Sequence, residues 1–332
     1  MKYFAPGFRA FFVRACLVSL SLACVSTVAW PQTYPNKPVH VIVQYPPGGT
    51  PDIYGRIMAS ELGKVWNQSV VVENRAGASG TIATDYVAKA APDGYTLLFA
   101  GDGPIVVVPH LMSKMPYDPV RDLAPISNVI EGGFVLFVNP AVPANNMSEL
   151  IAWIRSHPGK VSFASSGTGS PQHLSMEWIR TMAGGLDMIH VPYKGFGQAL
   201  ADVLAGQVQM VFSGATAAIQ LVKDPSKLKV MGITTKTRIK ALPQVPPIAD
   251  ALPGYEILTW YGFMAPARTP RPLIDKIHAD VRAIVKRPDF RERIVADGVE
   301  PIGNTPEEFA AEIKADLGVW GRIVKASGAK LN

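Results

Sequence analysis

Cysteine is almost absent from this chain of 332 residues, which contains only Cys16 and Cys24. Both lie in an apolar segment near the start, so the rest of the chain has no thiol for a disulfide or a cysteine metal site. Charged residues are also few, at 17% against 48% hydrophobic residues, a balance typical of a globular protein with a sizeable core. The 32 basic residues are dispersed among 26 acidic ones and form no recognisable nucleic-acid motif, so no nucleic-acid partner is expected.

Motifs of common catalytic sites are missing as well. The six histidines, at positions 40, 110, 157, 173, 190 and 278, form no HExxH motif, so no metal site is expected. Ser165 and Ser166 lack the preceding glycine of a nucleophile elbow, and Gly159 and Lys160 lack the rest of a phosphate-binding P-loop. The sequence therefore predicts a protein that is not an enzyme and needs no cofactor.

The first 29 residues have the pattern of a secretory signal peptide. Lys2, Arg9 and Arg14 precede an uncharged run over residues 15–29 that ends in small residues. This run is shorter than the roughly 20 residues that a membrane-spanning helix needs. Cys24 follows a sequence that partly resembles a lipoprotein processing site, although Ser21 stands where leucine is usual, so lipid anchoring is kept as the less favoured alternative to a released, periplasmic protein.

Short β-branched runs then alternate with longer amphipathic ones, which is the pattern of βαβ units around a mostly parallel sheet. The first series predicts strands at 39–43, 69–72 and 95–100 and helices at 53–64 and 80–90. A second series predicts helices at 148–156, 171–183 and 197–205 and strands at 161–164, 188–191 and 207–212. Two series, each with its own core, indicate an α/β protein with two lobes.

Two extended runs, 132–139 and 255–265, are interpreted as crossings between the lobes. The expected division is a lobe 1 of residues 34–134 plus 259–332 and a lobe 2 of residues 135–258. Helices are predicted near 271–286, 288–297 and 306–326. In the last helix Phe309, Ile313, Leu317, Trp320 and Val324 recur at steps of three or four, which predicts a core face that packs back on lobe 1.

A glycine-rich turn over residues 45–52 follows the first strand and opens a helix. Gly48 and Gly49 let the backbone approach a ligand closely, and the unpaired N–H groups of the helix start can accept a carboxylate or phosphate. Asp52 has two interpretations, a ligand acceptor in the pocket or a first-turn carboxylate that pairs with Arg56. Tyr45, at the strand end, either lines the pocket or packs in the lobe.

A second glycine-rich turn, residues 165–171, also lies between a predicted strand and a helix. Its hydroxyl groups and the N–H groups of Gly167, Thr168 and Gly169 are potential ligand donors. Ordinary turn and cap chemistry is the alternative. His173 could reach the cleft from the first turn of the helix or act as a capping residue behind the ligand.

With six motifs in this order, the sequence resembles the Bug, or TctC-like, substrate-binding proteins of tripartite tricarboxylate transporters. The motifs are PGGxxDxxxR from Pro47, VENRxGAxG from Val72, PDGYTLL from Pro92, YDPxRDLAPI from Tyr117, SGxGSxxHL from Ser166 and VPYKG from Val191. The resemblance covers nearly all of residues 34–330. It implies a type II periplasmic binding protein, a Venus flytrap of two lobes joined by two crossing hinge strands. Such a protein closes around a small carboxylate and delivers it to membrane permease subunits, and a monomer is expected.

The resemblance also implies a grip on one ligand carboxylate through main-chain N–H groups and ordered waters at the two turns. The site residues carried over are, in the first turn, Gly48, Gly49, Thr50 and Asp52 and, in the second, Ser166, Gly167, Thr168 and Gly169. Further candidates at the lobe edges are Tyr45, Gly101, Asp102, Ser170, His173, Tyr193, Lys194, Ser213 and Ala215.

Two positions depart from the family pattern, because Tyr45 is larger than expected and Asp102 is an acid where small or hydroxyl residues are usual. An acid near the cleft would favour a hydroxyl or amino group on the ligand. The sequence leaves the ligand open among dicarboxylic, aromatic, amino and nicotinate-like acids. It also leaves open a periplasmic sensor that presents its ligand to a membrane signalling protein.

Overall fold

The computed structural model of this chain describes residues 34–331, so the predicted signal peptide and both cysteines lie outside the described residues. The chain divides into a unit that ends at Asn36 and a unit from Lys37 to Asn332. Every helix and strand of the described residues belongs to the second unit. Among these helices, none combines the length and the apolar character needed to cross a bilayer.

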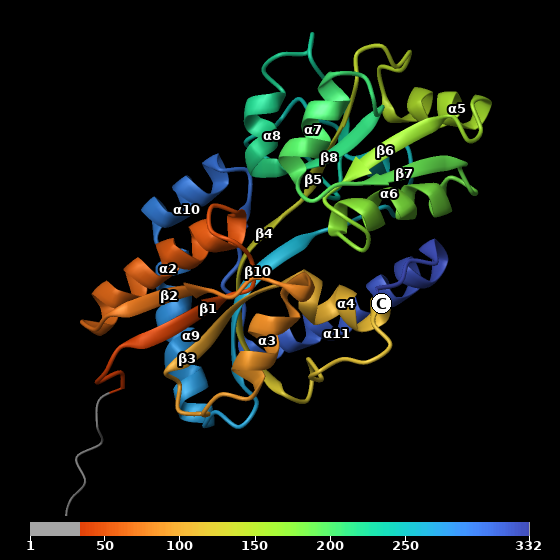
Figure 1. Ribbon diagram of the computed structural model, residues 1–332. Helices are drawn as coiled ribbons and strands as arrows, with labels where there is room; N and C mark the ends of the chain where they lie inside the picture. Colours follow the sequence, from red (N-terminus) through yellow and green to blue (C-terminus); the bar gives the residue numbers. More distant parts are fainter. Residues whose placement is uncertain (1–33, 332) are drawn as a thin grey trace, which may run out of the picture. The chain divides into compact units, whose positions relative to one another are not determined.

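A six-stranded mixed sheet contains strands from both ends of the second unit (Figure 1). Its order is β11-β4-β10-β3-β1-β2, and its strands are β1 (Val39–Val43), β2 (Val70–Asn74), β3 (Thr96–Gly101), β4 (Leu123–Gly132), β10 (Thr259–Pro266) and β11 (Glu300–Pro301). The strand β1 runs parallel to β2 and β3, whereas β10 is antiparallel to both β3 and β4. The carboxyl ends of β1 and β3 therefore lie at one edge, where the first glycine-rich turn follows β1.

A five-stranded sheet is built from the middle of the chain. Its order is β7-β6-β8-β5-β9, and its strands are β5 (Phe134–Val138), β6 (Val161–Ser165), β7 (Met188–Pro192), β8 (Met210–Gly214) and β9 (Lys229–Ile233). Here β6 is parallel to β7 and β8, and β5 is antiparallel to β8 and β9. The second glycine-rich turn follows the carboxyl end of β6. It therefore has the same position relative to this sheet as the first turn has relative to the six-stranded sheet, where it follows β1.

Two paired strands lead from one sheet toward the other. The strands β4 and β10 pair along their length, from Leu123 opposite Pro266 to Gly132 opposite Thr259. Only Gly133 separates β4 from β5, and Thr234 Oγ1, which accepts from Phe134 N at 2.8 Å, donates to the carbonyl oxygen of Ile257 at 2.6 Å. The lobe boundaries at 134–135 and 258–259 stay a prediction. The change of sheet between β4 and β5, and between β9 and β10, supports it.

Alternate residues of β5 explain why helices cover both faces of the five-stranded sheet. Val135 and Phe137 pack with residues of α7 (Phe196–Leu204) and α8 (Ala215–Leu221), whereas Leu136 and Val138 pack with α5 (Met147–Ser156) and α6 (Pro171–Met182). All four side chains are fully buried or nearly so. A strand with period two that is apolar at every position requires a cover on each face, which these helices supply.

The helix α2 (Thr50–Trp66) packs closely on the six-stranded sheet. A Cβ added to Gly55 would lie 3.1 Å from Val43 Cγ2 and 3.4 Å from the ring of Phe99, so a glycine permits this approach. Other helices of this part are α3 (Thr81–Ala88), α4 (Val108–Leu111), α9 (Arg271–Lys286) and α10 (Pro288–Ala296), with the short helices η1 (Ala78–Gly80) and η2 (Gly103–Val107). The short helix η3 (Ile248–Asp250) packs on β9 of the five-stranded sheet. The result is a turn at residues 45–50 anchored by a rigid helix.

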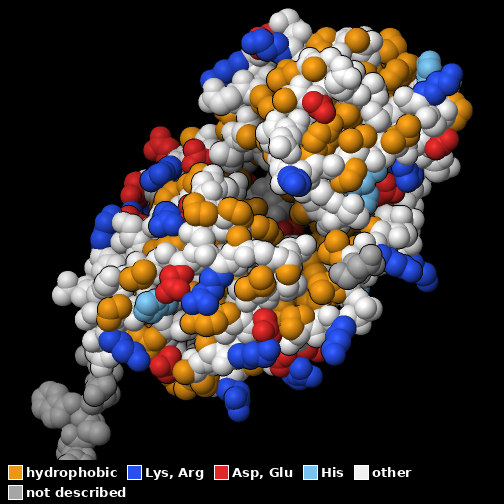
Figure 2. All heavy atoms as spheres, viewed as in Figure 1, with side chains coloured by type: hydrophobic (Ala, Val, Ile, Leu, Met, Phe, Trp, Pro, Cys, Tyr) orange, Lys and Arg blue, Asp and Glu red, His pale blue; other side chains and the backbone are white. Residues whose placement is uncertain are grey.

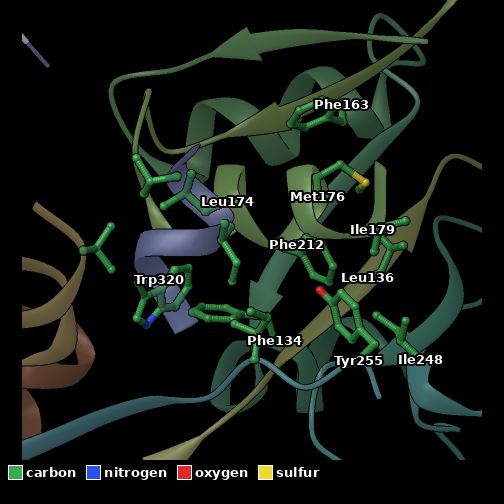
Figure 3. Close-up of a cluster of buried hydrophobic side chains, with 14 of the residues drawn as sticks. Phe134, Leu136, Phe163, Leu174, Met176, Ile179, Phe212, Ile248, Tyr255 and Trp320 are labelled. Atoms are coloured by element: carbon green, nitrogen blue, oxygen red, sulfur yellow. The ribbon is translucent and has the colours of Figure 1, made fainter. Parts of the chain in front are cut away.

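The last helix, α11 (Pro306–Ser327), contacts more than lobe 1. It packs on β4, η2 and α4, and also on α6. Figure 3 shows Trp320 of this helix beside Leu174, from the segment that the sequence assigns to lobe 2, and beside Phe134, the last residue that it assigns to the first part of lobe 1. The expectation of packing on lobe 1 alone was therefore incomplete. A helix of 22 residues is about 33 Å long, enough for its two ends to meet different layers.

Several elements differ from the sequence-based expectations. The predicted strands at 69–72 and 207–212 lie at Val70–Asn74 and Met210–Gly214, and the helix at 80–90 is shorter, Thr81–Ala88. The strands β4 and β9 and the π-helical turn η2 were not predicted. The residues of η2 form an apolar run between Gly103 and Pro109, which gives no periodic signal for a wider helical turn.

Candidate functional site

The two glycine-rich turns lie at one cavity of about 830 Å³. Figure 2 shows a hollow in this face of the molecule, with hydrophobic side chains along part of its rim. The residues that line the cavity are Tyr45, Pro46, Pro47, Gly48, Gly49, Pro51, Ser79, Gly103, Val108, Ser166, Thr168, Gly169, Ser170, Pro171, Lys194, Gly195, Phe196, Gly197 and Tyr261. The site is therefore formed by the ends of strands from both sheets and by the first residues of the helices that follow them.

The first turn is held in place by Asp52, which is 5% exposed. Asp52 Oδ2 accepts from Gly48 N at 2.9 Å, and Oδ1 accepts from Arg56 Nε at 3.0 Å and Asn74 Nδ2 at 2.8 Å. Burial raises the pKa of this carboxyl, but the three hydrogen bonds outweigh that effect and leave the pKa below its ordinary value. The geometry therefore matches the structural interpretation of Asp52, whose side chain anchors the turn from behind.

The second turn uses its own side chains to hold its backbone. Gly167 N donates to Ser165 Oγ at 3.1 Å, and Ser170 caps α6 by accepting from His173 N at 3.3 Å. Gly169 N donates to His173 Nδ1 at 3.1 Å. Gly167 and Gly169 have φ values of +123° and +79°, which only glycine adopts without strain. Ser170 N also donates to the Gly167 carbonyl oxygen, at 3.1 Å, so four N–H groups between Gly167 and His173 are already occupied by protein acceptors.

A stacked pair of imidazoles supports this turn. The rings of His173 and His190 lie 3.8 Å apart, and His190 Nε2 is 2.7 Å from Ser165 Oγ. Burial, followed by the neighbouring His190 and Arg180 charges, lowers the pKa of His173 to about 3. Burial and then Arg180 lower the pKa of His190 to about 4. Both rings are therefore neutral at neutral pH, and His173 Nδ1 can accept from Gly169 because its proton is on Nε2.

Aromatic rings and a buried acid form the part of the site at the ends of β1, β3 and β10. The ring of Tyr45 lines the cavity, and a Cβ added to Gly103 would lie 2.9 Å from its hydroxyl oxygen. Asp102 is 2% exposed, and its Oδ1 accepts from Gly103 N at 2.8 Å and Thr259 Oγ1 at 3.0 Å. Its other oxygen, Oδ2, has no hydrogen-bond partner among the described residues.

The ionisation of these groups follows from burial. Burial and, to a smaller extent, the charge of Asp316 raise the pKa of Asp102 to about 7, although the hydrogen bond from Thr259 opposes the shift. Burial and then the charge of Asp102 also raise the pKa of Tyr45 and that of Tyr261. The two phenols stay protonated at physiological pH and can act as hydrogen-bond donors.

Eight of the candidate site residues line the cavity, and nine do not. Those that line it are Tyr45, Gly48, Gly49, Ser166, Thr168, Gly169, Ser170 and Lys194; the others are Thr50, Asp52, Gly101, Asp102, Gly167, His173, Tyr193, Ser213 and Ala215. The Tyr193 hydroxyl donates to Asp202 Oδ2 at 2.6 Å, and Ser213 is fully buried. These two side chains therefore have structural partners away from the cavity.

Sequence reasoning missed several lining residues, notably Ser79, Phe196 and Tyr261. Ser79 has a φ of +55° and lies in the glycine-rich segment from Val72 to Gly80, a motif that could have indicated it. Tyr261 had been placed in a crossing strand but not in the site, since nothing in the local sequence shows which side of that strand meets the cavity.

The chain matches known proteins along nearly its whole length. The model of the tripartite tricarboxylate transporter family receptor, TctC, matches residues 54–329. Protein BugT of Bordetella pertussis is 33% identical over 317 residues, covering 95% of this chain and 96% of BugT. Rpa4515 of R. palustris, solved with adipate, is 32% identical with a TM-score of 0.80, covering 90% of this chain and 100% of that one. MatC from Rhodopseudomonas palustris, solved with bound malate, is 29% identical with a TM-score of 0.76, covering 88% and 100%.

These likenesses confirm the predicted α/β fold of a two-lobed periplasmic binding protein. They also confirm the resemblance that the six motifs indicated. The chain belongs to the TctC, or Bug, family of tripartite tricarboxylate transporter receptors.

Proposed function

We propose that this protein captures a small carboxylate between its lobes in the periplasm and delivers it to the membrane permease subunits of a tripartite tricarboxylate transporter. The capture uses main-chain N–H groups of the two glycine-rich turns, and no covalent step. Hydrogen bonds from both lobes to one ligand favour a closed arrangement over an open one, which is the basis of recognition by the permease.

One observation carries this proposal: turns from two different sheets line a single cavity. Each turn precedes a helix of at least 12 residues, α2 or α6, whose N-terminus carries a partial positive charge. Together the two helix starts favour an anion between them. Adipate in Rpa4515 and malate in MatC, both carboxylates, support this ligand class.

The hydrogen bonds within the turns narrow the set of donors available to the ligand. Gly48, Gly167 and Gly169 direct their N–H groups to Asp52, Ser165 and His173. The N–H groups of Gly49, Thr50, Ser166 and Thr168 have no acceptor within residues 34–331. Gly49, Ser166 and Thr168 line the cavity, and Thr50 lies between the lining residues Gly49 and Pro51. These four N–H groups are the donors that we assign to the carboxylate, with the hydroxyls of Thr168 and Ser170 beside them. The Ser166 hydroxyl donates to Gln172 Oε1 at 3.0 Å instead.

The test removes one N–H group without changing the fold. Thr50 is the first residue of α2 and follows Gly49, whose φ of −82° and ψ of 167° suit a residue before proline. Thr50→Pro therefore deletes the donor, whereas the control Thr50→Ala deletes only the hydroxyl. We expect Thr50→Pro to weaken carboxylate binding about tenfold or more, as loss of a hydrogen bond to a charged group does, and Thr50→Ala to change it little.

Binding is measured by thermal unfolding and calorimetric titration of residues 30–332, freed of carried-over ligand, against mono-, di- and tricarboxylates. A ligand at about 100 times its dissociation constant adds roughly 2.7 kcal/mol to the free energy of unfolding. Failure of every carboxylate to stabilise a folded sample would overturn the proposed function. Equal affinity of the proline and alanine variants would overturn the main-chain grip from Thr50.

A further inference from the structure

The charged groups around the cavity restrict what the ligand can carry. Among the described residues that line it, Lys194 is the single charged one, and neither aspartate nor glutamate is present. Lys194 is exposed and forms no ion pair within residues 34–331. A ligand ammonium group would therefore lose its hydration without meeting a counter-charge, whereas a carboxylate meets a cation and free N–H groups.

Apolar surface dominates the rest of the wall. Three aromatic residues line it: Tyr45 follows β1, Tyr261 lies in β10 and Phe196 begins α7. Four prolines and Val108 add further apolar surface. Tyr261 is stacked on Phe99 with ring centroids 6.5 Å apart and planes 16° apart, so its ring is fixed in orientation. Rings held in this way favour a flat apolar partner by stacking or edge contacts.

The polar groups lie where a single carboxylate would be gripped, at the two turns. A ligand with polar groups along its whole length would place several of them against the prolines, Val108, Phe196 and the faces of the two tyrosine rings, none of which offers a hydrogen bond. Burial of a polar group without a partner is unfavourable, so such a ligand loses affinity. The cavity of about 830 Å³ lies within the range of sites that hold ligands larger than a four-carbon acid.

We infer that the ligand is a monocarboxylate whose remaining part is an aromatic ring and which carries no ammonium group. This inference rests on the proposed function and narrows it to one substrate class. The carboxylate binds the turn N–H groups and Lys194, and the ring packs between Tyr45, Phe196 and Tyr261.

The first experiment is calorimetric titration of ligand-free residues 30–332 with five probes: benzoate, 3-phenylpropionate, L-phenylalanine, adipate and malate. We expect at least one of the two aromatic acids to bind tenfold or more tightly than both adipate and malate. We expect L-phenylalanine, which adds an ammonium group to 3-phenylpropionate, to bind at least tenfold more weakly than that acid. A smaller difference in either comparison overturns this inference and leaves carboxylate capture intact. If neither these probes nor the wider carboxylate panel binds, both this inference and the proposed function are overturned.

A pair of substitutions on α7 tests the placement of the ring. Phe196 begins this helix and lines the cavity, whereas Leu204 ends it, is 42% exposed and lies outside the lining. We expect Phe196→Ala to weaken binding of the aromatic acid about three- to tenfold and Leu204→Ala to leave it unchanged. Because Phe196 also packs on the core, Phe196→Leu is included and circular dichroism checks each fold. Unchanged aromatic affinity in both folded Phe196 variants overturns the placement.

Discussion

At the scale of single residues, Asp102 combines a buried carboxyl with an oxygen that no described residue hydrogen-bonds. Its pKa is raised by burial to about 7 from an ordinary 3.8. Between these values the folded protein binds more protons at this site than the unfolded chain does, so its contribution to stability falls as pH rises. The acid that the sequence placed near the cleft is therefore a buried group behind it.

Substitution of Asp102 by asparagine removes this titration. Asparagine keeps an oxygen for Gly103 and Thr259 but cannot ionise, so we expect the variant to gain stability relative to the native protein by about 2 kcal/mol between pH 5 and pH 8. Urea unfolding at both pH values measures the difference. Asp250→Asn, at an exposed position, is the matched control. A difference for Asp102→Asn that is the same at both pH values would contradict the linkage.

Residue-scale chemistry was only partly predictable. The two interpretations of Asp52 followed from its spacing to Arg56 on the same helix, but the choice between them depended on Asn74, which donates from β2 at 2.8 Å. His173 was expected at the cleft or behind it, and its bond to Gly169 N places it behind. Such outcomes depend on partners that lie far away in the sequence, so local patterns leave them open.

At the scale of elements, Gly262 sets how closely β10 approaches β4. A Cβ added there would lie 2.6 Å from the Ser127 carbonyl oxygen, 2.8 Å from the ring of Phe309 and 2.9 Å from Asn128 Cα. Two of these three neighbours are backbone atoms, which cannot move without disturbing the strand pairing. The contact of α11 with the paired strands therefore depends on the absence of a side chain at this position.

We expect Gly262→Ala to destabilise the protein by about 1–3 kcal/mol through overpacking. The control is Gly318→Ala, at an exposed position in the middle of α11, where an added Cβ would meet no side chain closer than Arg322 Nη1 at 4.0 Å. There alanine should stabilise by about 0.5–1 kcal/mol, since glycine is a poor helix former. Denaturant unfolding distinguishes the two; destabilisation of equal size in both variants would show that the close approach at Gly262 is not the cause.

Element prediction succeeded where hydrophobic periodicity was strong. The helix expected at 271–286 has those bounds in the structure, Arg271–Lys286, because its buried residues recur at helical spacing over four turns. The turn η2 and the strand β9 gave no comparable signal. Short apolar runs suit a strand or a helical turn equally well, and only tertiary contacts decide between them.

At the scale of the whole molecule, Trp320 belongs to a core cluster that contains residues of both sheets. It is 3% exposed and shares a core cluster with Phe134, Leu174 and Met264. We expect Trp320→Ala to lower the free energy of unfolding by about 3–5 kcal/mol, as large-to-small changes in a core do. Because this contact couples the two groups of elements, calorimetry should also show a transition that is broader than that of the native protein or resolved into two.

The control for this prediction is Trp153→Ala, since Trp153 on α5 is only partly buried against the same cluster. It should destabilise less and keep one transition. If Trp320→Ala left a single sharp transition with a small shift, coupling through α11 would be excluded.

The sequence by itself determined the family, the α/β alternation and the two glycine-rich turns, because these depend on local patterns: period-two and helical hydrophobicity, and glycine where the backbone must turn. The tertiary structure decided which N–H groups of the turns remain free, because Asp52, Ser165 and His173 occupy the others. It also brought Tyr261 to the same cavity as Tyr45, 216 positions away in the chain. Which N–H groups are free for a ligand, and which side chains line the cavity, both depend on contacts between segments that are distant in the sequence. Those contacts exist only once the chain has folded.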